Sequence, residues 1–379
     1  MKIGIITQPL AVNYGGLLQN YALQQVLLRL GHEVYTINRN NMPQIFSSPI
    51  VSRIKFYIKQ QIKRIIGLPA SPLHGECVRI ANHCRRFIHN NIIVTKMFKN
   101  QAELRKIVDA YKFDAYIVGS DQVWRPCYSE NIYNGFLDFC QGQQGVKRIA
   151  YASSFGVADW EFSEEQTREC KNLIKLFDAV SVREDSGVNL CQEYLGIDAQ
   201  HVLDPTLLLD KEDYQKLAEE MKEPISAGEL FCYILDNNQE IATAIQNISS
   251  KLSLKAFEVK AKKTNDVRKW GENIRDYVIP SPTKWLRAFM DAKMVFTDSF
   301  HGCVFSLIFN KPFWVVGNKE RGNARFESLL KLFGLENRRI SLDEITHVNL
   351  NASIDWDRVN ALKREWREKS VAFIEKSLR

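Results

Sequence analysis

Polar side chains gather where an apolar strand runs into an apolar helix, late in the chain. Residues 294–297 predict a buried strand and residues 304–309 the helix after it. Between them lie Asp298, Ser299, His301 and Gly302. Open α/β folds place ligands at such junctions, where free N–H groups attract anions and a histidine exchanges protons near neutrality. The pattern predicts an anion and proton-transfer site; the alternative is an N-cap beside a histidine without function.

A second junction, with paired glycines, opens the chain. Residues 2–7 predict a strand and residues 17–30 a helix, and Asn13, Gly15 and Gly16 lie between them. Paired glycines let a ligand or backbone approach closely and direct N–H groups outward. Because the third glycine of the dinucleotide fingerprint is missing, we expect a cleft floor and not a dinucleotide site.

Six motifs, in this order, resemble the polysaccharide pyruvyl transferase family over nearly the whole chain. They are Asn13-Tyr-Gly-Gly, Tyr116-Ile-Val-Gly-Ser-Asp-Gln-Val-Trp124, Ala179-Val-Ser-Val-Arg183-Glu184, Val202-Leu-Asp204-Pro205-Thr-Leu-Leu-Leu, Asp298-Ser-Phe-His301-Gly302 and Arg321-Gly-Asn-Ala-Arg325-Phe. One departure is Gly16-Leu17, where many relatives carry an acidic residue. The resemblance implies transfer of a pyruvyl group from phosphoenolpyruvate to two hydroxyls of a sugar in a capsule or exopolysaccharide precursor. A cyclic ketal forms and phosphate is released.

Three residues are the expected catalytic groups. With the resemblance included, protonated His301 is the acid, Asp121 the base for the sugar hydroxyl, and Arg183 a bidentate grip on phosphate or carboxylate. The alternatives are a salt bridge from Arg183 to the neighbouring Glu184 or Asp185, and an N-cap at Asp121.

The expected substrate-binding residues surround these three. They are Asn13, Gly15, Gly16, Ser120, Trp124, Asp298, Ser299, Gly302, Arg321 and Arg325. Trp124 is expected to stack on a sugar ring, with a core tryptophan as the alternative. Arg321 and Arg325 either hold phosphate or acceptor or decorate a solvated loop. Asp204, before Pro205, is predicted to end a strand at a turn.

Composition is that of an average globular protein. The 379 residues exceed one ordinary core and predict two domains. The net charge of +7, from 51 basic and 44 acidic residues, suits anionic ligands and is too small to indicate nucleic acid. Without a recognisable signal peptide or spanning run, we expect a cytoplasmic protein, including the inner face of the membrane.

No metal or cofactor is expected, since phosphoenolpyruvate is the donor substrate. The eight cysteines are scattered and are interpreted as reduced thiols. One cluster raises the question of zinc, but its spacing matches no common zinc pattern: His74, Cys77, His83 and Cys84.

Alternating strands and helices predict an α/β fold of two Rossmann-like domains facing a cleft, and the resemblance implies the same, GT-B-like architecture. The first domain is expected at 1–225, with a polar junction at 222–228, and the second at 226–350. Short strands are expected at 256–259 and 277–279. Residues 351–379 predict an amphipathic helix that returns to the first domain.

Residues 41–100 are interpreted as a basic helical insertion. No acidic residue occurs from Asn41 to Gly75, and residues 50–66 alternate lysine and arginine with isoleucine. This pattern indicates either a helix on an anionic membrane surface or a helix pair that caps the first domain or makes a dimer contact.

Two other functions fit the same architecture. One is a GT-B-type glycosyltransferase that uses a nucleotide-sugar, and the other is a non-catalytic member of a polysaccharide assembly complex. The expected partners are phosphoenolpyruvate and a glycan acceptor, either free or lipid-linked, together with a homo-oligomer as an open option.

Overall fold

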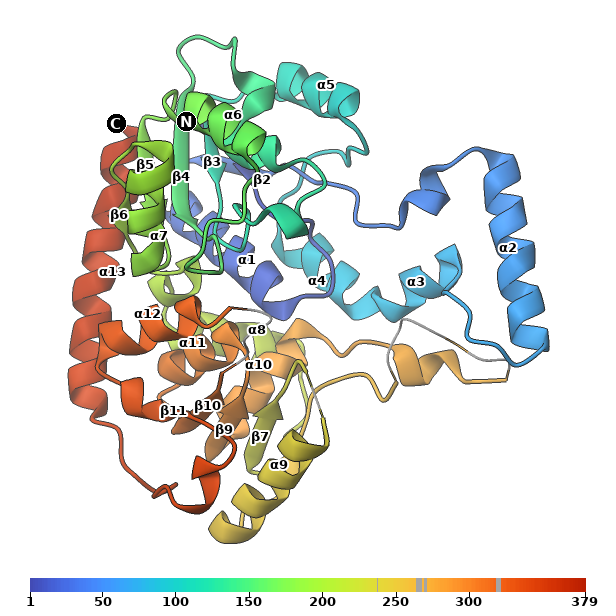
Figure 1. Ribbon diagram of the computed structural model, residues 1–379, viewed down its shortest axis with the longest axis vertical. Helices are drawn as coiled ribbons and strands as arrows, with labels where there is room; N and C mark the ends of the chain where they lie inside the picture. The colour runs from blue at the N-terminus through green and yellow to red at the C-terminus, as the bar shows by residue number, and fades with distance from the viewer. Residues whose placement is uncertain (237, 264–267, 269–270, 318–321) are drawn as a thin grey trace.

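Two parallel sheets form the framework of the protein. The computed structural model describes residues 1–236, 238–263, 268, 271–317 and 322–379. In Figure 1 the first sheet lies above the second, with helices on the faces of both. The strand orders are β2-β1-β3-β4-β5-β6 and β11-β10-β9-β7-β8, and the neighbouring strands pair in parallel. The predicted pair of Rossmann-like α/β sheets is confirmed.

Strands in this framework are short and mostly buried on both faces. In the first sheet they are β1 (Lys2–Ile6), β2 (Glu33–Thr36), β3 (Ala115–Val118), β4 (Lys147–Ser153), β5 (Ala179–Val182) and β6 (Gln200–His201). In the second they are β7 (Leu230–Tyr233), β8 (Ala256–Phe257), β9 (Met294–Thr297), β10 (Phe313–Val316) and β11 (Arg339–Ile340). Every residue of β3, β9 and β10 is buried, which explains their continuous apolar sequences.

Helices connect these strands and cover both sheets. They are α1 (Tyr14–Arg29), α2 (Ile50–Ile65), α3 (His74–Ile80), α4 (Asn82–Asn91), α5 (Gln101–Tyr111), α6 (Glu164–Ile174), α7 (Asp185–Leu190), α8 (Lys211–Glu220), α9 (Gln239–Leu252), α10 (Pro282–Asp291), α11 (Phe300–Ile308), α12 (Ala324–Phe333) and α13 (Trp356–Leu378). The local sequence determines where several of these helices begin. The Ser281 side chain accepts the Lys284 N–H and Pro282 occupies the first turn of α10.

Two expected strands of the second domain differ from the structure. The prediction of a strand at 277–279 is wrong, because a 3₁₀ helix, η7 (Ile274–Tyr277), occupies the start of this range. The Asn273 side chain accepts the Arg275 N–H at 3.0 Å, which favours a turn, and Pro280 cannot donate to a ladder. The strand at 256–259 is limited to the two residues of β8.

The two sheets are joined by helices that contact both. Helix α8 packs against α10, and the Tyr214 ring lies 5.0 Å from the ring of Phe305 in α11. Helix α13 crosses back, where its Ser370 hydroxyl accepts the Leu203 N–H at 3.0 Å and its Phe373 ring lies 6.3 Å from that of Tyr151. Figure 1 shows α13, in red, running along the edge of both sheets. The halves therefore share one apolar core.

Among the helices of the described residues, none combines the length and the apolar character that crossing a bilayer requires.

Helix α13 should contribute strongly to stability. Ile374, 1% exposed, lies in the shared core, so Ile374→Ala should lower the free energy of unfolding by about 2–5 kcal/mol. Lys376→Ala, at an exposed position of the same helix, should change it by less than about 0.5 kcal/mol. Urea denaturation measures both. Equal effects of the two variants would show that α13 does not pack on the core.

Candidate functional site

A buried carboxylate, that of Asp204, lies at the centre of the site. One of its oxygens, Oδ2, accepts hydrogen bonds from the Ser120 hydroxyl at 2.9 Å and from Nη1 of Arg183 at 2.7 Å. The same oxygen lies 3.7 Å from Nε2 of His301. These four residues follow β3, β5, β6 and β9, so the carboxyl edges of both sheets meet here.

Asp204 also performs the turn role expected of it. Its other oxygen, Oδ1, accepts the N–H of Thr206 at 3.0 Å and the Thr206 hydroxyl at 2.6 Å, starting the 3₁₀ helix η6 (Pro205–Leu208). Burial alone would raise the pKa of Asp204, but His301 and Arg183 hold that pKa well below its ordinary value. The sequence analysis missed the central position of this carboxylate. The sequence did contain a signal for it: Asp204 is a charged residue that follows β6, the strand next to β5 in the sheet.

Arg183 makes the salt bridge that was the alternative to binding a donor. Its Nε lies 3.3 Å from Glu184, so the salt bridge to a neighbour exists. Nη2 has no hydrogen-bond partner among the residues that the structure describes, so one donor group remains for a ligand. Burial opposes its charge, but Glu184 and Asp204 raise the pKa of Arg183, and the guanidinium stays protonated.

His301 enters the site from the first turn of α11, against Gly15 in the first turn of α1 in the opposite half. A Cβ atom added to Gly15 would overlap the imidazole ring. A Cβ on Gly16 would lie 3.0 Å from Oδ2 of Asp121. Glycine at these two positions lets a ring and a carboxylate approach the backbone closely. Of the three residues expected at the cleft floor, Asn13 lines the open cleft described below, whereas Gly15 and Gly16 do not.

Arg325 brings a second guanidinium to the site from the start of α12. Its central carbon lies 5.9 Å from the Phe300 ring, and that of Arg183 lies 4.4 Å from the same ring. Burial, together with the charge of Arg183, lowers the pKa of Arg325 to about 10. Two arginines from opposite halves therefore converge on one aromatic ring, where an anion would reduce their repulsion.

Asp121 adopts a backbone conformation that is costly for a residue with a side chain. Its φ is 91°, and it is 8% exposed. Its carbonyl accepts the N–H groups of Val123 at 2.8 Å and Ser154 at 3.1 Å, which holds this conformation. No α-helix begins in this described segment, so the N-cap alternative does not apply. Its Oδ1 accepts the Gln122 N–H at 2.8 Å, and its Oδ2 lies on the side of Gly16.

Two expected binding residues prove to be structural. Trp124 is fully buried, its ring lies 5.1 Å from that of Phe136, and its Nε1 donates to the Gly135 carbonyl at 2.7 Å. The expected stacking on a sugar is therefore wrong, because an indole suits a core as well as a sugar. The Asp298 carboxylate accepts the N–H groups of Leu235 and Asp236 at 2.8 and 3.0 Å, which fixes the loop after β7.

The remaining residues that were expected to bind substrate differ in burial and in their contacts. Ser299 is the N-cap of α11 without a side-chain cap bond, and it is 6% exposed. A Cβ on Gly302 would overlap the Thr297 side chain, so Gly302 permits close packing of α11 on β9. Asn13 is exposed at the start of α1. Arg321 lies outside the described residues.

An open cleft of about 980 Å³ lies beside the buried cluster. Asn13 and Tyr14 form its wall on the first half. The second half contributes residues 232–236 and 258–263, among them three lysines. A space of this size fits a small ligand. Asp298 links the cleft to the cluster, because it holds the lining residues Leu235 and Asp236 and precedes His301 in the same junction.

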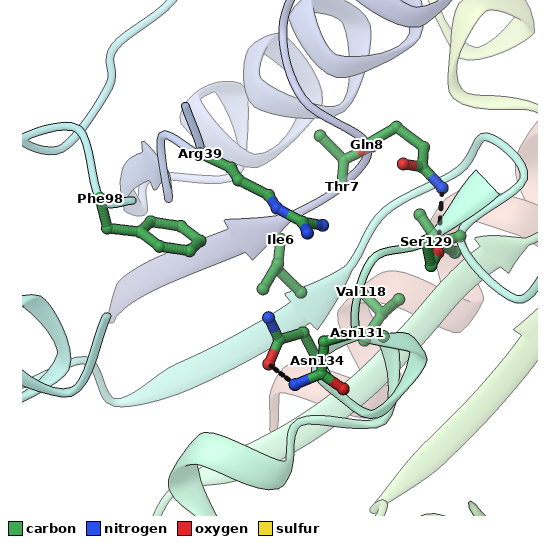
Figure 2. Close-up of a pocket in the computed structure, with 11 residues that line it drawn as sticks. Ile6, Thr7, Gln8, Arg39, Phe98, Val118, Ser129, Asn131 and Asn134 are labelled. Carbon is green, nitrogen blue, oxygen red and sulfur yellow. Dashed lines mark hydrogen bonds between the residues drawn. The ribbon is translucent and has the colours of Figure 1, made fainter. Parts of the chain in front are cut away.

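A second hollow lies at the end of β1. Figure 2 shows the Arg39 guanidinium directed into it, with Gln8 and Ser129 across from it. It offers about 20 Å³, which is room for about one water molecule. This hollow is too small for a sugar or a phosphoester.

The described residues contain no group of three or more His, Cys, Asp or Glu side chains arranged to hold a metal ion.

Comparison with known families decides the membership of the chain. The family model of polysaccharide pyruvyl transferases matches residues 13–320. The chain belongs to the polysaccharide pyruvyl transferase family. A search of curated proteins gives no significant match.

Solved structures show the same architecture at low identity. The UDP-GlcNAc 2-epimerase of Methanocaldococcus jannaschii is 13% identical, with a TM-score of 0.52 over 97% of this chain and 99% of that one. The MnaA protein of S. aureus, solved with UDP, is 11% identical, with a TM-score of 0.52 over 100% and 96%. At this identity the likeness concerns the fold alone, and it confirms the expected two-domain, GT-B-like arrangement of this pyruvyl transferase family member.

The contact between Gly15 and His301 can be tested with a double-mutant cycle of unfolding free energies. Gly15→Ala should destabilise the protein by about 1–3 kcal/mol, because the new methyl group overlaps the imidazole. In a His301→Ala background the same change should cost nearly nothing. Gly75→Ala, at a helical glycine with open space around it, is the matched control. Additive costs in the denaturation cycle would disprove the contact.

The Asp204 carboxylate should be essential to the buried charge network. Asp204→Asn leaves Arg183 undercompensated and should cost about 3–5 kcal/mol of unfolding free energy. Because folding lowers the pKa of Asp204, the wild-type advantage should hold near neutrality and shrink as pH falls below about 4. Asp198→Asn, at an exposed position, is the control. An advantage that stays constant down to strongly acidic pH would contradict this assignment.

Proposed function

We propose that this protein transfers a pyruvyl group from phosphoenolpyruvate to two hydroxyls of a sugar in a cell-surface polysaccharide precursor. The observation that carries the proposal is the convergence of Arg183, Arg325 and His301 from opposite halves, in a chain of this family. Cations of this kind suit a donor with a phosphate and a carboxylate.

The donor is proposed to bind around the Phe300 ring. Arg183 offers its Nη2 group, and Arg325 supplies a second guanidinium on the same ring. An anion between two mutually repelling cations is stabilised by both, in a site where water is largely excluded. These side chains are under 10% exposed, and we propose that the donor reaches them from the neighbouring cleft.

The chemistry requires proton movements that balance. A proton added to the methylene carbon of phosphoenolpyruvate makes its central carbon electrophilic, and the first sugar oxygen bonds there as it loses its proton. The second sugar oxygen then displaces phosphate, which leaves with the remaining proton. The net products are one cyclic ketal and one phosphate.

His301 and Asp121 are the proposed proton carriers. His301 is the proposed acid, and its Nε2 lies 3.7 Å from the Asp204 carboxylate, which can orient the imidazole. Asp121, whose Oδ2 lies next to Gly16 in the first turn of α1, is the proposed base for the sugar hydroxyl. Its strained backbone conformation is consistent with a functional position.

The open cleft is the proposed acceptor site. Its volume of about 980 Å³ exceeds what the donor needs. Asn13 and Tyr14, which line it, directly precede Gly15 and Gly16 in the chain. Three lysines on the opposite wall, Lys260, Lys262 and Lys263, suit an acceptor that carries phosphate.

Calorimetric titration with phosphoenolpyruvate tests the donor site. His301→Gln and Arg325→Gln should each weaken binding by about 1.5–3 kcal/mol, or roughly 10- to 150-fold, because a charged partner is lost. Arg168→Gln, at an arginine with a 67% exposed side chain, should bind as the wild type does.

The outcomes separate the candidate functions. Absence of phosphoenolpyruvate binding, with binding of a nucleotide-sugar instead, would overturn the proposal in favour of a glycosyltransferase. Binding without phosphate release from any glycan acceptor would indicate a non-catalytic member of an assembly complex.

A further inference from the structure

Helix α2 presents an apolar face to solvent. Figure 1 shows it at the margin of the molecule, away from both sheets. Ile54, Ile58 and Ile62, spaced four residues apart, have exposed fractions of 52%, 51% and 52%. The same face includes other residues that are more than half exposed: Ile50, Val51, Tyr57 and Ile65. Solvent-facing helices normally turn such a face inward.

The polar side of α2 faces the protein. Gln60 and Arg64 are each 4% exposed. Nη2 of Arg64 lies 2.6 Å from Oε2 of Glu76 and donates to the Ser71 carbonyl at 3.1 Å, while Gln60 accepts the Ser71 N–H at 2.9 Å. These polar contacts fix the rotation of the helix, so the apolar face is held outward.

Positive charge borders this face. Lys55, Lys59 and Lys63 follow one another at four-residue intervals and form a row along the helix. Arg53 is exposed as well, and the whole segment from Asn41 to Gly75 lacks an acidic residue. The surface is therefore complementary to a partner that is apolar inside and anionic outside.

We propose that α2 binds the surface of an anionic phospholipid bilayer. The helix, about 24 Å long, lies in the plane of the interface with its isoleucines at the boundary of head groups and acyl chains. The lysine row contacts lipid phosphates. A second copy of the chain fits less well, because an isologous contact through α2 would bring two cationic rows together without a carboxylate to pair them.

The insertion connects this helix to the cleft. Arg268 exchanges backbone hydrogen bonds with Ala70, at 2.9 and 3.3 Å, and its side chain pairs with Glu76. The Ile279 N–H donates to the Ile80 carbonyl at 3.0 Å, and Ile279 lines the cleft. The segment after α2 therefore joins the helix to residues of the second half, one of which lines the cleft.

Vesicle flotation of the full-length protein tests this inference. The protein should float with phosphatidylcholine vesicles that contain phosphatidylglycerol, and less with phosphatidylcholine alone or at high salt. Ile58→Asp should weaken the apparent vesicle affinity at least about tenfold, because a charge replaces an inserted apolar side chain. Ile225→Asp, at a 78% exposed isoleucine outside the insertion, should leave it unchanged.

A charge-matched pair tests the lysine row. Lys59→Glu should weaken binding at least about fivefold, whereas Lys216→Glu, with a 77% exposed side chain on α8, should have little effect. Failure to float, equal effects within either pair, or equal binding to neutral vesicles would overturn the proposal. A different result would also overturn it: the protein binds no vesicles, but light scattering shows concentration-dependent dimers that Ile58→Asp abolishes.

Discussion

The buried carboxylate of Asp204 is the interaction on which the rest of the site depends. A charge without water needs partners, and here they come from the ends of β3 and β5, from η6 and from α11. Without it, the buried guanidinium of Arg183 would have only Glu184 as a neighbouring carboxylate. One side chain thus contacts a guanidinium and lies close to an imidazole that belong to opposite halves of the molecule.

The shared core makes this arrangement durable. Helices α8 and α13 pack on both halves, and one apolar cluster spans them, so the two carboxyl edges are held facing each other. Close approach then becomes possible, and Gly15 accommodates the imidazole ring because it has no side chain. A preorganised polar cluster beside an open cleft is what group transfer with charged intermediates requires.

In the insertion at residues 41–100 the usual arrangement of a helix is reversed. Helix α2 exposes its apolar face to solvent, and its polar side chains Gln60 and Arg64 make contacts with the protein. Arg64, Glu76 and Arg268 link it to the segment that lines the cleft. These contacts join the proposed lipid-binding helix to the half of the molecule that lines the cleft.

The sequence by itself determined the framework. Strands buried on both faces, such as β3 and β9, read as continuous apolar runs, and charged residues after them mark the carboxyl edge of a sheet. Tertiary structure alone decided which of those residues meet. Asp204 and Ser120 are 84 positions apart, and Trp124 turned toward Phe136 because its indole fits a core as well as a sugar. Local patterns specify secondary structure and edges, whereas partners distant in sequence are chosen by how the halves pack.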